Sequence, residues 1–303
     1  MEPPIAARRP TERLLHGDSV SDDYFWMRDR SAPEVIDYLE AENAYTQAMT
    51  DHLAPLRKEI FSEIKDRTQE TDLAVPAKRG DYWYSTRTEE GRPYSIWVRM
   101  TGGPDGEETV LLDENDAAGG HDYFRIANFS ISPDAATVGY SVDTDGGERY
   151  VTRFRDASTL VDLDDEIPNT SYGAAWASDS LHYFYTVPDA AMRPWQVWRH
   201  RIGTPASDDV LVREEPDDRY YLSVRRSRSG AFIFVWAESA ITSETQFIPA
   251  ADPTADPMQV LARVEGVEYT VDHRGDDFWI VTNDQSVDGR LVRLPVDGGE
   301  PCL

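Results

Sequence analysis

The chain has 303 residues, of which 40% are hydrophobic and 11% aromatic, so it can bury a large core in one or two domains. Its 30 basic and 56 acidic residues give a formal net charge of −26, and this excess of carboxylates disfavours a nucleic-acid partner. The single cysteine, Cys302, excludes an internal disulfide, and no apolar run reaches the roughly 18 residues of a membrane helix. We therefore expect a soluble, cytoplasmic protein that does not contact a membrane.

The first 30 residues are rich in proline and charge, and His16-Gly17-Asp18 predicts a turn. His16, Asp18 and Ser19 are the residue types of a catalytic triad. A triad, however, brings its groups together from separate elements, so these near neighbours are interpreted as a turn.

Two helices are predicted next. Ser31-Ala32-Pro33-Glu34 has the pattern of a capping box with proline in the first turn, so a helix is expected to start there. Pro55 opens a second helix. Apolar residues recur near helical spacing in both, at Val35, Leu39, Tyr45, Met49, Leu56, Ile60 and Ile64. This stripe needs a partner, and the rest of the chain does not obviously supply one.

From Val75 onward the pattern is that of strands. The clearest unit is a hairpin of residues 181–187 and 195–200, preceded by a tight polar turn at Ser178-Asp179. The same turn recurs, with anchors at positions 81, 134, 179, 230 and 276 that are 53, 45, 51 and 46 residues apart. A repeat of roughly 40 to 50 residues, each a small antiparallel sheet, is typical of a β-propeller. The predicted fold is therefore all-β, a β-propeller preceded by an N-terminal helical segment.

The repeats predict strands at 82–86, 94–99, 109–112, 124–129, 137–142, 149–154, 181–187, 195–200, 210–213, 220–224, 231–236, 245–249, 259–263, 268–271, 278–282 and 290–294. The fifth repeat lacks its outer strand, and an unpaired edge is an aggregation hazard. We expect an N-terminal part at 1–74 and about five propeller blades at 75–303, the last incomplete. The sequence therefore has the pattern of a fragment of a longer chain.

Three common catalytic or nucleotide-binding motifs are absent from the sequence: the G-x-S-x-G nucleophile elbow, the P-loop and the H-E-x-x-H zinc motif. His182 and His200 fall on neighbouring strands and could face each other, but structural histidines are favoured over a metal site. Asp143-Thr144-Asp145-Gly146 starts like a calcium loop and is interpreted as a hairpin turn. The other histidines, His16, His52, His121 and His273, are scattered.

Two acidic stretches, 162–166 and 214–218, are interpreted as loops between strands. Solvated rims are the favoured interpretation of both. The alternative is that they draw in cationic peptides.

Together these residues resemble the oligopeptidase B group of the prolyl oligopeptidase family of serine peptidases, along essentially the whole chain. The motifs that carry the resemblance are HGD at 16–18, YFWMRD at 24–29, PEV at 33–35, YLEAEN at 38–43, SPD at 132–134, QVWRH at 196–200, IGTP at 202–205, EE at 214–215, DD at 217–218 and TSE at 242–244.

The resemblance implies a seven-bladed propeller that covers an α/β-hydrolase domain of the same chain, with the N-terminal helices packed on that domain. It implies cleavage of short basic peptides after Arg or Lys, with the propeller restricting access to a Ser-Asp-His triad. In this family the triad follows the propeller, so no catalytic residue, cofactor site or metal site is assigned within 1–303. The alternative function is a free-standing propeller that binds peptide or protein without catalysis.

Overall fold

The computed structural model describes residues 2–299, so Cys302 lies outside the described part. The contacts between Cα atoms divide the chain into two compact units, and the boundary along the chain lies between Asp72 and Leu73. No helix within residues 2–299 is both long enough and apolar enough to cross a membrane.

The first unit holds a hairpin and two helices. The hairpin pairs β1 (Thr11–Leu15) with β2 (Asp18–Asp22), and His16 and Gly17 form its turn with positive φ angles of 51° and 90°. The turn predicted at His16-Gly17-Asp18 is confirmed. The helices are η1 (Phe25–Arg28), α1 (Pro33–Thr50), η2 (Asp51–Leu53) and α2 (Ala54–Arg67).

The capping box predicted at Ser31 is wrong. The residue before α1 is Ala32, which makes no side-chain cap, and Pro33 is the first helical residue. Ser31 instead donates its hydroxyl to Asp29, and Glu34 pairs with Arg9 at 2.6 Å. The proline at the first helical position therefore sets the start of the helix without a capping hydroxyl.

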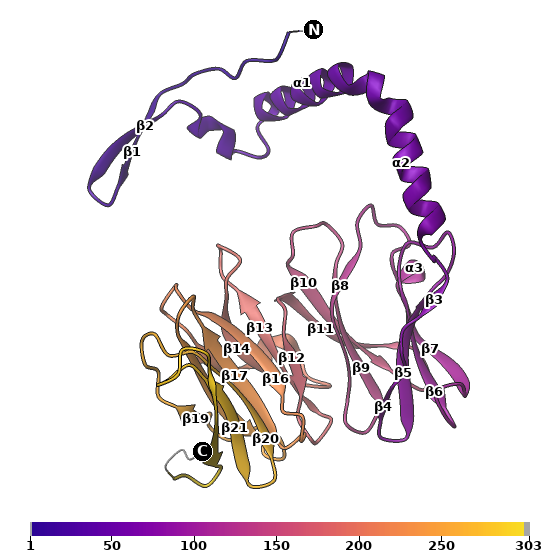
Figure 1. The fold of residues 1–303 in the computed structure, drawn as a ribbon, viewed down its shortest axis with the longest axis vertical. Coiled ribbons are helices and arrows are strands. Elements are labelled where there is room, and N and C mark those ends of the chain that lie inside the picture. The colour runs from indigo at the N-terminus through magenta and orange to yellow at the C-terminus, as the bar shows by residue number, and fades with distance from the viewer. Residues whose placement is uncertain (1, 300–303) are drawn as a thin grey trace. The chain divides into compact units, whose positions relative to one another are not determined.

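The second unit consists, within the described residues, of five antiparallel sheets in chain order (Figure 1). Sheet 1 contains β3 (Asp72–Leu73), β4 (Ala77–Arg79), β5 (Tyr82–Thr88), β6 (Ile96–Thr101) and β7 (Glu107–Asp113), followed by the short helix α3 (Glu114–Ala117). Sheet 2 contains β8 (Arg125–Ile131), β9 (Thr137–Asp143), β10 (Tyr150–Asp156) and β11 (Asp162–Thr170). Sheet 3 contains β12 (Ala174–Trp176), β13 (His182–Pro188), β14 (Pro194–Arg201), η3 (Ala206–Asp208) and β15 (Val210–Glu214).

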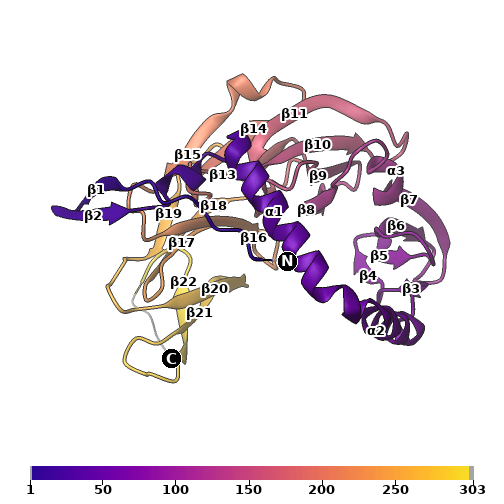
Figure 2. The same cartoon turned by 90° about the horizontal axis from the view of Figure 1, so that it is seen from above.

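Sheet 4 contains β16 (Tyr221–Arg226), β17 (Phe232–Glu238), β18 (Ser243–Pro249) and β19 (Met258–Leu261). Sheet 5 contains β20 (Tyr269–Arg274), β21 (Asp277–Thr282) and β22 (Arg290–Pro295). Figure 2 shows the sheets following one another side by side, from sheet 1 in magenta to sheet 5 in yellow. Each polar turn of the sequence repeat joins two antiparallel strands of its sheet, so the next hairpin turn along the chain lies at the opposite end of that sheet. This opposite end holds the hairpin turns 189–193 and 239–242 and the connections 215–220 and 262–268 that link one sheet to the next, and is called the linker end.

The core lies between consecutive sheets. One apolar cluster joins sheets 2 and 3 around Phe154, Trp176 and Tyr183, and another joins sheets 4 and 5 around Phe234 and Phe278. Side chains alternate along each strand, so a central strand sends one row of residues to each neighbouring sheet. This explains why the strands at 231–236 and 278–282 were predictable as apolar, aromatic runs.

The interpretation of 162–166 as a loop is wrong, because these residues begin strand β11. Leu163, Asp165 and Ile167 point toward the interior, while Asp162 and Glu166 pair with Arg155 and Arg153 on the neighbouring strand β10. Charged residues on the outer face of an edge strand discourage pairing with other chains.

Candidate functional site: an ion network at the linker end

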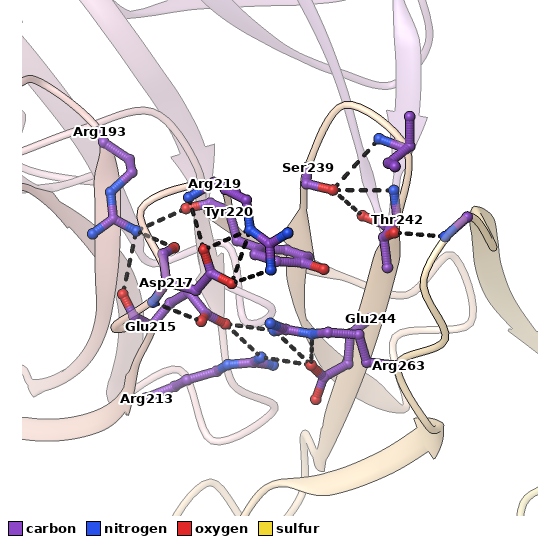
Figure 3. A network of polar contacts seen from close by, with 12 residues as sticks. Arg193, Arg213, Glu215, Asp217, Arg219, Tyr220, Ser239, Thr242, Glu244 and Arg263 are labelled. Atoms are coloured by element: carbon purple, nitrogen blue, oxygen red, sulfur yellow. Dashed lines mark hydrogen bonds and ion pairs between the residues drawn. The ribbon is translucent and has the colours of Figure 1, made fainter. Parts of the chain in front are cut away.

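Four charged side chains from sheets 3 and 4 meet at the linker end (Figure 3). Arg263 lies 2.5 Å from the carboxylate of Glu215 and 2.7 Å from that of Glu244. Arg213 lies 3.4 Å and 3.2 Å from the same two carboxylates. Two arginines thus neutralise two glutamates, of which Glu215 is 4% exposed.

The sequence places each of these groups at the end of a strand. Arg213 lies on β15 and Glu215 directly follows that strand, so the two side chains, two residues apart, project to the same face. Glu244 lies on β18, and Arg263 lies in the connection from β19 to β20. The network therefore ties the connection between sheets 3 and 4 to sheet 4 itself.

Arg193 and Tyr220 extend the network toward the hairpin of sheet 3. The guanidinium of Arg193 donates to the carbonyl oxygens of Glu215, Asp217 and Tyr220, at 3.2, 3.0 and 2.9 Å. The guanidinium of Arg263 lies 3.7 Å from the centroid of the Tyr220 ring, a cation–π contact. The connection 215–220 is therefore held on both sides.

The neighbouring arginines keep the carboxylates of Glu215 and Asp217 ionised. Burial acts to raise the pKa of Glu215, but the hydrogen bonds and charges of Arg263 and Arg213 outweigh it, so the pKa lies below its ordinary value. The side-chain hydrogen bond from Arg219 lowers the pKa of Asp217 to about 2. Glu215 and Asp217 are engaged with arginines of the same chain, which leaves Glu214 and Asp218 as the exposed acids of the stretch 214–218.

A groove of about 630 Å³ lies beside the network. Tyr220, Tyr221, Ile241 and Thr242 line it together with Arg219 and Arg263. Tyr221 is 56% exposed and Ile241 is 55% exposed. The linker end thus offers apolar surface on a rigid, charge-balanced base, which suits contact with another protein surface or a peptide.

His182 and His200, which by their strand positions could have faced each other, do not. Tyr183 lies opposite His200, and Arg201 lies opposite His182, so the two imidazoles occupy adjacent positions and point to opposite sheet faces. His182 contacts Asp179 at 2.6 Å, and His200 contacts Asp209 and Asp165. Both are structural histidines, as predicted.

The remaining candidates are also structural. Asp143 accepts hydrogen bonds from the backbone N–H groups of Asp145, Gly146 and Glu148, which confirms a hairpin turn at this position. The hydroxyl of Ser19 donates to Glu12 at 2.8 Å. Among residues 2–299, no group of three or more His, Cys, Asp and Glu side chains could hold a metal ion.

Sequence reasoning missed the basic half of the network. Glu215 and Glu244 lie in motifs noted above, whereas Arg193, Arg213 and Arg263 drew no attention. The buried Glu215 and the partly buried Glu244 require cationic partners, and the available signal was the presence of arginines near the ends of neighbouring predicted strands.

Comparison with known proteins identifies the class. Residues 3–302 match the family described as prolyl oligopeptidase, N-terminal beta-propeller domain. The chain therefore belongs to this β-propeller family, and the resemblance noted in the sequence is confirmed.

Individual relatives agree with this assignment. Protease 2 of Moraxella lacunata is 35% identical over 98% of this chain and 44% of the relative. Dipeptidyl aminopeptidase BI of Pseudoxanthomonas mexicana is 35% identical over 97% of this chain and 43% of the relative. The structure of oligopeptidase B from Leishmania major superposes with a TM-score of 0.92 at 29% identity, over 98% of this chain and 45% of that one. The chain thus spans less than half the length of the relatives that it matches.

Proposed function

We propose that this chain is the N-terminal segment and about five of seven blades of an oligopeptidase B-like serine endopeptidase. In this proposal an α/β-hydrolase domain of the same full-length protein carries the Ser-Asp-His triad. The enzyme works in the cytoplasm, cleaves short peptides after Arg or Lys, and uses the propeller to restrict access to the active site. The observation that carries the proposal is the match of nearly the whole chain to less than half of each related peptidase.

The exposed apolar residues on the helices of the first unit support the proposal of a partner domain. Of the residues of α1 only Val35 is buried, and α2 has no buried residue. Leu39, Leu56 and Phe61 are 50%, 52% and 68% exposed. Apolar surface of this extent is unfavourable in water, so we propose that a hydrolase domain covers residues 1–74.

The exposed apolar face of sheet 5 supports the proposal of further blades. On β21, Phe278 and Ile280 are buried against sheet 4, while the alternate residues Trp279 and Val281 are 37% and 51% exposed. Leu291, opposite Val281 on β22, is 52% exposed. In the proposed enzyme another blade packs on this face.

The preference for basic peptides is proposed from the net charge of the chain. The net charge of −26 favours the approach of cationic peptides over long range. The acids of the network are paired, so in this proposal selection of Arg or Lys takes place in the hydrolase domain.

The test starts with the coding DNA beyond Leu303. If the frame continues through further repeats to a G-x-S-x-G elbow, the full-length protein and the 303-residue chain are both purified and given reporter peptides. The reporters differ only in the residue before the scissile bond, Arg, Lys, Ala or Pro, and each is made with a free and a blocked N-terminus. We expect the full-length protein to cleave the blocked Arg and Lys reporters, and the 303-residue chain to cleave none.

Two outcomes would contradict the proposal. Cleavage of the free reporters alone would indicate release of dipeptides, the activity in the name of the Pseudoxanthomonas mexicana relative. A stop codon after Leu303, with a monomeric chain that unfolds cooperatively, would favour the free-standing propeller that binds peptide or protein.

A further inference from the structure

His200 is fully buried in the interface between sheets 2 and 3. It lies on β14 of sheet 3 with 0% of its surface exposed, and its ring stacks on Phe154 of sheet 2 with centroids 5.5 Å apart. Phe154 belongs to the apolar cluster that joins the two sheets. A titratable side chain therefore lies in the interface, beside the apolar cluster that joins the two sheets.

Each ring nitrogen of His200 faces a carboxylate. Nδ1 lies 2.7 Å from Oδ1 of Asp209, which precedes β15 of sheet 3 and is 1% exposed in its side chain. Nε2 lies 3.1 Å from Oδ1 of Asp165, which lies on β11 of sheet 2 and is 8% exposed in its side chain. The imidazole thus joins the outer strand of sheet 2 to sheet 3.

The proton count decides the charge of the ring. An ionised carboxylate only accepts hydrogen bonds, and a neutral imidazole has one N–H and one lone pair. A neutral ring would therefore point a lone pair at the lone pairs of one of the two carboxylates, which is repulsive. Two simultaneous hydrogen bonds require both nitrogens to carry a proton.

Each carboxylate accepts one further hydrogen bond and has no other cationic partner among the described residues. Asp209 also accepts the hydroxyl of Tyr185 at 2.8 Å, and Asp165 also accepts the backbone N–H of Gly203 at 2.5 Å. No Lys or Arg of the described residues forms an ion pair with Asp165 or Asp209. The groups that face His200 from the packed elements are Asp165 from β11, Asp209 from the segment after η3, Tyr183 and Tyr185 from β13, and Phe154 from β10.

We propose that His200 is a buried imidazolium that clamps sheet 2 to sheet 3, and that loss of its second proton loosens this seam. The remaining proton stays on Nδ1, which makes the shorter hydrogen bond to Asp209. The hydrogen bond from Nε2 to Asp165 is therefore the one that breaks. The released carboxylate lies on β11, beside a groove of about 710 Å³ lined by residues 163–166 and 202–206. Loosening of the seam would widen this groove, and this inference does not depend on the proposed peptidase activity.

The direction of the pH effect follows. Burial acts to lower the pKa of His200, but the hydrogen bonds and charges of Asp209 and Asp165 outweigh it and hold the pKa above the ordinary value of 6.5. A raised folded-state pKa stabilises the fold fully below the unfolded value and loses this contribution as pH rises through the folded value. The contribution of the clamp is therefore complete below the unfolded value of His200 and is lost as pH rises through the raised folded value.

Nitrogen-15 NMR of the 303-residue chain with labelled histidine tests the protonation state directly. Substitution His200→Gln identifies the signal of this ring among the six histidines of the chain. We expect both ring nitrogens to resonate at imidazolium positions at about pH 7, where an ordinary histidine is mostly neutral. A neutral ring at this pH would overturn the proposal.

The variant Asp165→Asn tests the clamp while it keeps the shape of the side chain and the bond to Asp209. We expect His200 to lose its second proton at lower pH, and hydrogen exchange of β11 to become faster at about pH 7. The matched control is Glu166→Gln on the same strand, whose carboxylate pairs with Arg153 on the solvent face and is 55% exposed. An unchanged titration in Asp165→Asn, or an equal change in Glu166→Gln, would refute the clamp.

Discussion

At the scale of single residues, the ion network holds two arginines and two glutamates, so removal of one carboxylate leaves an excess of positive charge. Glu215→Gln leaves Arg213 and Arg263 with only Glu244 as an acidic partner. Breaking a buried ion pair by removing one partner costs about 3–5 kcal/mol. We expect a loss of this order in the free energy of unfolding, measured by urea denaturation at neutral pH.

Glu214→Gln is the matched control, because Glu214 is exposed and bonds only the side-chain amide of Gln196. Its loss should stay within about 0.5 kcal/mol. The pKa of Glu215 is lowered in the folded chain, so its contribution is present above its unfolded value and lost as pH falls through its folded value. The gap between wild type and Glu215→Gln should therefore shrink in acid, and a pH-independent gap would contradict this account.

Gly139 shows how closely sheets 2 and 3 pack. A Cβ atom at this position on β9 would lie 3.2 Å from both the Trp176 and Tyr183 rings and 3.4 Å from the Phe154 ring. Three aromatic rings hold each other in place, so none can move cheaply. Gly139→Ala should lower the free energy of unfolding by about 1–3 kcal/mol through overpacking, measured by thermal or urea unfolding. Unchanged or increased stability would mean that the seam is loosely packed.

At the scale of elements, arginines join neighbouring sheets through backbone carbonyl groups. Arg99 of β6 donates to the carbonyl oxygens of Ala135 and Ala157 in sheet 2, at 3.1 and 3.0 Å. Its guanidinium lies 4.3 Å from the centroid of the Tyr82 ring. One planar group thus fixes sheet 1 against a turn and a strand end of sheet 2.

Arg99→Lys should destabilise this contact. The lysine ammonium is a compact group that cannot reproduce the planar fork of donors and its stacking on the tyrosine ring, although the charge is kept. We expect a loss of about 1–3 kcal/mol in unfolding free energy. Arg87→Lys on β5 is the control, since Arg87 pairs with the carboxylates of Glu89 and Glu108 near the surface and should lose less than about 0.5 kcal/mol. Equal losses in the two variants would contradict a special role for Arg99.

The elements also show what the sequence could and could not predict. Strands such as β13, β17 and β21 were predictable because they are runs of apolar and aromatic residues, which in β13 and β17 are mostly buried on both faces and in β21 are buried on one. β11 was not, because four of its first five residues are acidic and a local pattern does not reveal an arginine-bearing neighbour strand. The acidic half of the ion network was visible in motifs, whereas its convergence depends on contacts between residues 48 apart, such as Arg263 and Glu215.

At the scale of the whole molecule, the series of sheets ends in a face that nothing in the described chain covers. Trp279, Val281 and Leu291 form this face of sheet 5, and each is at least 37% exposed. Their alternate neighbours Phe278, Ile280 and Val292 are at most 4% exposed against sheet 4. A strand that is apolar on both faces is typical of a sheet with a neighbour on each side.

Val281→Thr distinguishes a covered face from a free one, because the change keeps the shape and adds a hydroxyl group. In the 303-residue chain, where Val281 is 51% exposed, we expect a change within about 0.5 kcal/mol in unfolding free energy. In a longer chain whose next sheet covers this face, the buried hydroxyl should cost about 1–3 kcal/mol. Val287→Thr is the control in both chains, since Val287 is 94% exposed beside the same sheet. Equal, small effects of Val281→Thr in both chains would mean that no further sheet packs here, and would favour a propeller that functions without the proposed additional blades.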